Sequence, residues 1–254
     1  MDAVARPLIH GAGTAEPAWR QILAATRPTR VVDAAGLVTG CTRVVVVAPH
    51  PDDEVLGVGA TLRMLANRGL DSLLVSVTRG EASHPASQQW SPAELGLRRL
   101  AERDAGLARL GWSPGAIVQA GLPDGEVAAH EDRLESLLAS RLRGCDAVFT
   151  TWRGDGHPDH EATGRAVARA CAAHGARLFE FPVWMWHWAQ PADTRVPWSR
   201  LARIACTAAA RDAKRLAIRA HATQLAPDET TGRPAILPTS TLLRFDRDYE
   251  SVFA

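Results

Sequence analysis

Arg43-Val-Val-Val-Val-Ala48, followed directly by Pro49-His50-Pro51-Asp52-Asp53-Glu54, is the stretch of sequence that decides the fold. Its run of β-branched residues has no polar alternation, which is typical of a parallel strand buried on both faces. Over 54–68 the apolar side chains then recur at helical spacing. A buried strand that leads through a short polar turn into a helix indicates a strand–helix–strand unit.

The same alternation continues along the chain. It predicts strands at 43–48, 73–78, 115–120, 146–151 and 177–182, with helices at 54–68, 92–110, 130–142 and 160–174. We therefore expect an α/β fold, an open and mostly parallel sheet in three layers with helices on both faces. Ligands of such sheets bind beyond the carboxyl ends of the strands, so the turn after residue 48 is the first place to look for a site.

The two ends of the chain have less regular patterns. Residues 1–40 are interpreted as a lead-in with a helix over 15–26 capped by Thr14. Residues 195–254 are interpreted as a C-terminal extension with a helix at 208–223 and a late strand at 241–246. Because no repeat or low-complexity linker divides the sequence, we expect one domain over 1–254.

Composition and charge exclude several function classes. The 254 residues are 46% hydrophobic and 22% charged, and a net charge of +1 without runs of like charge argues against a nucleic-acid partner. No apolar stretch approaches the ~18 residues of a membrane span. The four cysteines, at 41, 145, 171 and 206, form no CxxC pair, so no cysteine-based zinc site is expected. Sparse cysteine and the absence of an apolar leader predict a cytoplasmic location.

The turn after the first long strand carries an imidazole and three carboxylates. A dinucleotide site would need glycines there, and the acids would repel its phosphates. Asp52, Asp53 and Glu54 could simply complement a helix dipole, but that interpretation leaves His50 unexplained. His50 and Asp53, three residues apart across a tight turn, offer the nitrogen and oxygen ligands that a divalent metal needs.

A second polar cluster follows the strand at 146–151, at the same edge of the predicted sheet. It reads Trp152-Arg-Gly-Asp155-Gly-His157-Pro-Asp159-His160-Glu161. A single histidine at such a place is commonly structural, whereas two histidines and two aspartates in one short loop indicate a site. One of these histidines would complete a His/Asp/His metal site with an open fourth position, which is the mark of catalytic zinc.

Together, Ala48-Pro-His50-Pro-Asp52-Asp53-Glu54 and His157-Pro-Asp159-His160 resemble the PIG-L/LmbE-like N-deacetylase family. The resemblance implies a zinc enzyme of Rossmann-like fold. Members of the family deacetylate N-acetylglucosaminyl lipids, mycothiol and bacillithiol precursors, and glycopeptide antibiotics. Matched residue by residue, it makes His50, Asp53 and His160 the ligands of one Zn²⁺ per chain, a set that would also accept Fe²⁺ or Co²⁺.

The resemblance also assigns catalytic roles. Asp52 becomes the general base that activates water for attack on an amide. His157 is expected to stabilise the oxyanion or to protonate the leaving amine. Asp159 is expected to orient His157.

Weaker echoes of the family suggest substrate contacts. They are Thr78-Arg-Gly80-Glu81, Arg99-Leu-Ala-Glu102 and Leu122-Pro-Asp124-Gly125. The resemblance implies that Arg99 and Asp124 contact sugar hydroxyls, although surface salt bridges use the same residue types. Asp155 stands where some relatives carry tyrosine, so the role of that tyrosine does not transfer, and Asp155 itself is assigned to the substrate side.

Two later segments leave alternatives open. Pro182-Val-Trp184-Met-Trp186-His-Trp188 places its tryptophans at strand spacing on one face, either as packed core or as an aromatic platform for substrate that includes Trp186. His221, in Ala220-His221-Ala-Thr-Gln224, is either a pocket residue or a structural hydrogen-bonder. Selectivity is expected from the loops at 82–92, 121–132 and 184–200.

The sequence thus predicts a metal-dependent hydrolase that removes an N-acyl group, foremost acetyl, from a small amino-sugar conjugate such as a GlcNAc glycoside, a glycolipid or a glycosylated natural product. One alternative is a metal-dependent phosphoesterase, which would need carboxylates that bridge two metals, and only Asp155, Asp159 and Glu161 are available. Another is a non-catalytic sugar- or metal-binding protein. Asp52 and His157 argue against it, because binding alone requires neither a base nor an acid.

Overall fold

The computed structural model describes residues 9, 11–25, 30–144 and 146–254, so expectations that fall on residues 1–8, 26 and 145 lie outside it. Within this part, the strands join one eight-stranded sheet of order β1-β7-β8-β6-β5-β2-β3-β4. Neighbours run parallel, except that β8 is antiparallel to β6 and β7. The strands are β1 (Arg30–Val32), β2 (Arg43–Ala48), β3 (Asp71–Ser76), β4 (Ala116–Gln119), β5 (Asp146–Thr151), β6 (Arg177–Phe181), β7 (Leu201–Ala205) and β8 (Tyr249–Phe253).

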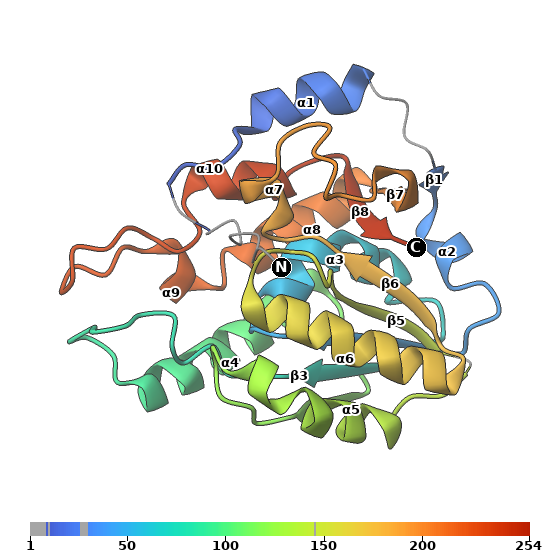
Figure 1. Cartoon of the computed structure of the whole chain (residues 1–254), viewed down its shortest axis with the longest axis horizontal. Coiled ribbons are helices and arrows are strands. Elements are labelled where there is room, and N and C mark those ends of the chain that lie inside the picture. Colours follow the sequence, from blue (N-terminus) through green and yellow to red (C-terminus); the bar gives the residue numbers. More distant parts are fainter. Residues whose placement is uncertain (1–8, 10, 26–29, 145) are drawn as a thin grey trace, which may run out of the picture.

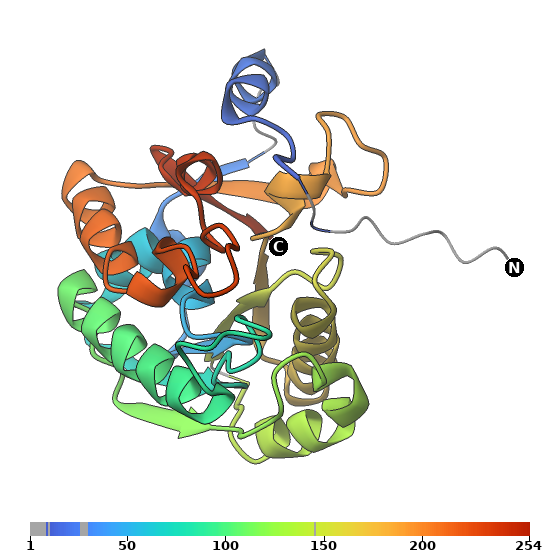
Figure 2. The ribbon, with the colours of Figure 1, turned by 90° about the vertical axis from the view of Figure 1, so that its left-hand side faces the viewer.

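Helices cover both faces of this sheet, as the alternation predicts (Figure 1). Figure 2 shows α5 and α6 on one side, with α3, α4 and α8 on the other. The helices are α1 (Glu16–Ala25), α2 (Ala34–Leu37), α3 (Asp53–Leu65), α4 (Pro92–Leu110), α5 (Glu131–Ala139), α6 (Pro158–His174), α7 (Met185–Trp188), α8 (Ala208–Ile218), α9 (Ala222–Leu225) and α10 (Thr239–Leu242). The fold is therefore α/β with a mostly parallel sheet.

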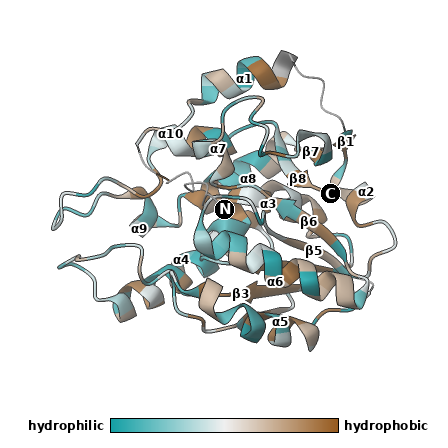
Figure 3. Ribbon diagram, viewed as in Figure 1, coloured by the Kyte–Doolittle hydropathy of each residue, from teal (hydrophilic) through white to brown (hydrophobic). Residues whose placement is uncertain are grey.

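The valine run of β2 supplies both layers of the core. Val44 and Val46 pack in the cluster that includes α3 and α8, whereas Val45 and Val47 pack in the cluster that includes α5 and α6. Alternate side chains of a strand point to opposite faces, so an unbroken apolar run is required here. Figure 3 shows the resulting hydrophobic strands beneath more polar helices. No helix in the described part of the chain combines the length and apolarity that a membrane crossing requires.

The predicted elements are confirmed from β2 to β6, and β2, α4 and β5 have the predicted bounds. The strand predicted at 241–246 is wrong. Pro238 opens the short helix α10, whose Leu242 amide donates to the Pro238 carbonyl, and a 3₁₀ turn follows over Leu243–Phe245. Leu242 and Phe245 reach the core from helical turns, and the true strand, β8, comes later.

Position in the sheet explains why two distant polar loops meet. Strands β2 and β5 are parallel neighbours near the middle of the sheet, with Val47 beside Thr150. Their carboxyl ends therefore open at the same edge. The turns that follow them, into α3 and α6, carry the two polar clusters of the sequence.

Gly57 lets α3 approach the sheet. A Cβ there would lie 2.0 Å from the buried Phe181 ring, whereas a Cβ on Gly59 would make ordinary contacts of 3.4 Å or more. We expect Gly57→Ala to lower the free energy of unfolding by ~1–3 kcal/mol through overpacking. Gly59→Ala is the control in the same helix and should be neutral or stabilising. Urea unfolding checks this, and equal stabilities would contradict it.

Candidate functional site

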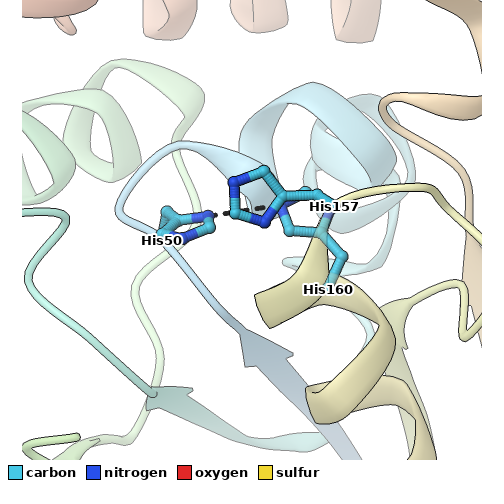
Figure 4. Close-up of side chains that lie close together, drawn as sticks. All are labelled: His50, His157 and His160. Carbon is cyan, nitrogen blue, oxygen red and sulfur yellow. Dashed lines mark hydrogen bonds between the residues drawn. The ribbon is translucent and has the colours of Figure 1, made fainter. Parts of the chain in front are cut away.

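Three buried donor atoms converge where β2 and β5 end. His50 Nδ1 lies 3.2 Å from Asp53 Oδ2 and 3.2 Å from His160 Nε2, and His160 Nε2 lies 3.3 Å from Asp53 Oδ2. Ligands of a tetrahedral zinc at bond lengths near 2.0–2.1 Å are separated by about 3.3 Å. Figure 4 shows the rings of His50 and His160 turned toward each other, with His157 beside them. The donor set and its spacing fit one divalent metal.

The electrostatics of this cluster favour a cation. Burial alone would lower the pKa of His160, but the Asp53 and Asp155 carboxylates raise it to about 9. Burial would likewise lower the pKa of His50, but hydrogen bonds to the carboxylates of Asp124, Asp159 and Asp53 raise it well above its ordinary value. The carboxylates thus create a strongly negative potential at the converging nitrogens, which protons or a metal ion neutralise.

Each proposed histidine ligand is held from behind by a carboxylate. His160 Nδ1 lies 2.8 Å from Asp155 Oδ2. His50 Nε2 lies 3.1 Å from Asp124 Oδ1 and 3.3 Å from Asp159 Oδ2. Such contacts fix the tautomer, so that the nitrogen facing the centre keeps its lone pair, and they raise its basicity.

Asp155 is not a substrate contact, which corrects the sequence prediction. Its side chain is fully buried, and it accepts hydrogen bonds from the backbone amides of Val183, Trp184 and Met185 while facing His160. Its oxygens are therefore engaged within the protein. Asp155 ties the His160 ring to the segment that joins β6 to α7.

Asp159 also has a different partner from the one predicted. Its carboxylate accepts from the amides of Gly125 and Val127 and lies against His50. The only recorded hydrogen bond between Asp159 and His157 runs from the Asp159 backbone amide to the ring, at 3.2 Å. Because Asp159 lies in the first turn of α6 and its carboxylate binds the amides of Gly125 and Val127, it orients His50 rather than His157.

His157 caps α6 and lines the cavity beside the three donor atoms. Its Nδ1 accepts the Asp159 amide, so the ring proton of neutral His157 is on Nε2. Burial and the neighbouring charges of His160 and His50 lower the pKa of His157 to about 2. His157 is therefore a neutral hydrogen-bond donor.

Asp52 immediately precedes α3 and faces the same cavity. Burial raises the pKa of Asp52 to about 6, against the opposing effect of the Arg99 guanidinium. Arg99 Nη2 donates to Asp52 Oδ2 at 3.1 Å, and Nη1 donates to the Gly80 carbonyl at 2.9 Å. Arg99 lines the cavity, and its guanidinium is bound to Asp52.

The three segments that weakly resemble family motifs lie together around Asp52 and Arg99. Gly80 has φ of +67°, and a Cβ there would lie 2.1 Å from the Arg99 guanidinium, so only glycine suits the position. Glu81 accepts the amide of Asp124, and Asp124 in turn accepts the amide of Ala82. The two loops are thereby joined, and the Asp124 carboxylate is placed at the cavity beside His50.

The cavity itself has a volume of about 280 Å³ and is lined by both polar and apolar side chains. The polar ones include Ser83, Asp124 and Gln224, and the apolar ones include Leu56, Val183, Trp184, Ile236 and Leu237. The predicted selectivity loops at 82–92, 121–132 and 184–200 each contribute at least one residue. Ile236 and Leu237 were missed, because nothing in their local sequence marks them as site residues.

Two predicted substrate contacts lie outside the residues that line this cavity. Trp186 is 3% exposed and packs edge-on against Trp19, with the Arg247 guanidinium 4.1 Å from its ring. His221 is 1% exposed beneath the site, next to Gly106 of α4. The strand spacing assumed for the tryptophans is wrong, because residues 185–188 form a helix, which sends Trp184 to the cavity and Trp186 to the core.

Comparisons with known proteins agree with this fold. The solved structure of the A40926 pseudoaglycone deacetylase Dbv21 is 26% identical, with a TM-score of 0.60, and the match covers 84% of this chain and 96% of that one. The N,N'-diacetylchitobiose deacetylase from Pyrococcus horikoshii shares the fold, with a TM-score of 0.59 at 21% identity over 85% of this chain and 82% of that one. The fold and site thus define an α/β protein of the deacetylase type.

A particular family is identified by sequence. The model of the PIG-L family, GlcNAc-PI de-N-acetylase, matches residues 45–171, which is half of the chain, and the protein belongs to that family. A 1D-myo-inositol 2-acetamido-2-deoxy-alpha-D-glucopyranoside deacetylase from Mycobacterium sp. (strain KMS) is 28% identical over 232 residues. That match covers 72% of this chain and 74% of the relative.

The split between Trp184 and Trp186 is testable by stability. We expect Trp186→Ala to lower the free energy of unfolding by ~3–5 kcal/mol, because it empties a core position and leaves Arg247 without its ring. Trp184→Ala should cost less, since Trp184 is only partly buried. Urea unfolding of both variants is the measurement, and a larger loss for Trp184→Ala would refute this assignment.

Proposed function

We propose that this protein is a metal-dependent N-deacetylase of amino-sugar conjugates, with zinc as its metal and His50, Asp53 and His160 as the ligands. The observation that carries the proposal is the triangle of donor atoms at 3.2–3.3 Å, which opens into a cavity that Asp52 and His157 also line. Membership of the PIG-L family supports the amide-hydrolysing chemistry.

The residues divide the work of amide hydrolysis. A bound zinc ion would polarise the acyl carbonyl and lower the pKa of water. Asp52, with a pKa of about 6, accepts the proton of the attacking water and can return it to the leaving amine. His157 donates its Nε2–H to the oxygen on which negative charge develops, a role that suits a neutral imidazole.

The mixed polar and apolar lining of the cavity suits a sugar that carries an apolar group. Carboxylate, hydroxyl and amide groups of Asp124, Ser83 and Gln224 match sugar hydroxyls, while Trp184 and its apolar neighbours match a sugar face or an aglycone. Relatives named for an inositol-linked GlcNAc and for a glycopeptide antibiotic pseudoaglycone support this substrate class.

The phosphoesterase alternative finds no support in the carboxylates it would need. Asp155 and Asp159 are bound by backbone amides and face His160 and His50. Glu161 accepts the amide of Gly156 and pairs with Arg165. Asp155 and Asp159 thus hold the two histidine ligands in place, and Glu161 is bound to Gly156 and Arg165.

Measuring metal binding distinguishes the roles of His157 and His160. We expect His160→Ala to lose the bound metal, because it removes one of three ligands. His157→Ala should retain the metal at wild-type stoichiometry while losing most turnover, because it removes only the oxyanion donor. Elemental analysis of both purified variants is the measurement, and the reverse pattern would exchange the two roles.

Asp52→Asn tests the base. We expect it to retain zinc and to lower kcat by ~10²–10⁴-fold, because an amide cannot accept the proton. The assay is mass spectrometry of zinc-loaded wild type and variant with N-acetylated substrates, namely GlcNAc, N,N'-diacetylchitobiose, an inositol-linked GlcNAc and a glycopeptide. Loss of one acetyl group with wild type alone supports the proposal. An unmodified panel with metal-loaded wild type would argue against it.

A further inference from the structure

Helix α3, which begins with Asp53, is broken in its middle. Val58 has φ of −136° and ψ of 19°, outside the helical range, between the glycines at 57 and 59. An undisturbed α-helix would join the Ala60 amide to the Leu56 carbonyl, four residues earlier. At this break each of these two groups has a charged side chain as a partner.

A buried ion pair occupies the break. Lys214, on α8, donates to the Leu56 carbonyl at 2.8 Å. Glu250, on β8, accepts the amides of Ala60 and Thr61 at 2.9 and 2.8 Å. The two side chains then meet each other at 2.6 Å. They thus connect the two sides of the break through four hydrogen bonds, which we call the α3 clasp.

The charges suit the two helical halves that they join. Glu250 binds amides at the start of the second half, where the helix dipole favours an anion. Lys214 binds a carbonyl at the end of the first half, where the dipole favours a cation. Both side chains are nearly inaccessible, at 5% and 3% exposure, so their bonds are little screened by water. The clasp therefore fixes the break in one geometry.

The first half of α3 is the element that this geometry positions. It spans only Asp53 to Gly57, with Asp52 immediately before it. Leu56, whose carbonyl Lys214 holds, lines the catalytic cavity itself. A shift of this short segment would move Asp53 Oδ2 relative to His50 and His160.

We propose that Lys214 and Glu250 are positioning residues, which set the placement of Asp53 and Asp52 through the break in α3; the proposal rests on the proposed function. Buried ion pairs contribute little net stability compared with apolar residues of similar volume. The geometry that the pair imposes on α3 is therefore its main effect. Lys214 is the only lysine of the chain, and neither it nor Glu250 is among the residues that line the cavity beside the three donor atoms.

The test compares the clasp with a matched ion pair elsewhere. Glu16 and Arg247 form a second buried pair, with the Glu16 side chain 3% and the Arg247 side chain 5% exposed. This pair joins α1 to the segment before β8. We would measure thermal unfolding, the affinity for Zn²⁺ by chelator competition, the visible spectrum with Co²⁺, and kcat and KM. The variants are Lys214→Met, Glu250→Gln and the control Glu16→Gln.

We expect all three variants to unfold at lower temperature, because each leaves a buried charge without its partner. Only the clasp variants should bind Zn²⁺ roughly 10- to 100-fold more weakly, as loss of a group that orients a metal ligand does. They should also change the Co²⁺ spectrum and lower kcat with little change in KM. Glu16→Gln should keep wild-type metal affinity, Co²⁺ spectrum and kcat.

A double variant, Lys214→Met with Glu250→Leu, removes both charges and keeps the test valid if a single variant fails to fold. Weak metal binding by this folded variant would support the proposal. Wild-type metal affinity and Co²⁺ spectrum in the double variant or in the folded single variants would overturn it. A wild-type protein that binds no divalent metal would refute the proposed function, and this proposal with it, so the two failures are distinguishable.

Discussion

Mutual repulsion among three buried donor atoms is the constraint on which the rest of the site depends. Two imidazole nitrogens and a carboxylate oxygen face one another at 3.2–3.3 Å in a region that water barely reaches. Lone pairs held so closely are unfavourable unless a cation or protons lie between them. The fold holds them together by placing two parallel strands side by side and fixing each ligand from behind.

The groups that fix the ligands come from segments far apart in the chain. Asp155 links His160 to the segment that joins β6 to α7, and Asp159 links His50 to the loop before α5. On the opposite face, Lys214 and Glu250 bind the broken helix that carries Asp53. The carboxylates of Asp155, Asp159 and Glu250 therefore have the hydrogen-bond partners that a buried charge requires. Asp155, which the sequence analysis assigned to the substrate, instead holds the His160 ring in place.

The sequence predicted local features well and distant ones poorly. The alternation of apolar segments predicted the strands and the edge of the sheet at which the two polar loops lie, and the resemblance to the PIG-L/LmbE-like family assigned His50, Asp53 and His160 to the metal. Their signals are local, because each lies within one strand–turn–helix segment. Trp186 was misjudged because one helical turn changes which face a side chain occupies. Asp155 was misjudged because its carboxylate oxygens accept hydrogen bonds from the amides of residues 183–185, which follow β6. The sequence of its own loop does not reveal these partners.

By itself the sequence determined the α/β class, the edge of the sheet at which the site lies, and the chemistry of its nitrogen and oxygen donors. Periodicity and motif spacing are properties of neighbouring residues, so they can be read without coordinates. Only the tertiary structure decided which carboxylate supports which histidine and which apolar residues line the cavity. It also decided that Lys214 and Glu250 form hydrogen bonds with the backbone of α3. Those contacts join segments far apart in the chain, and their partners are set by packing of the whole sheet and its helices.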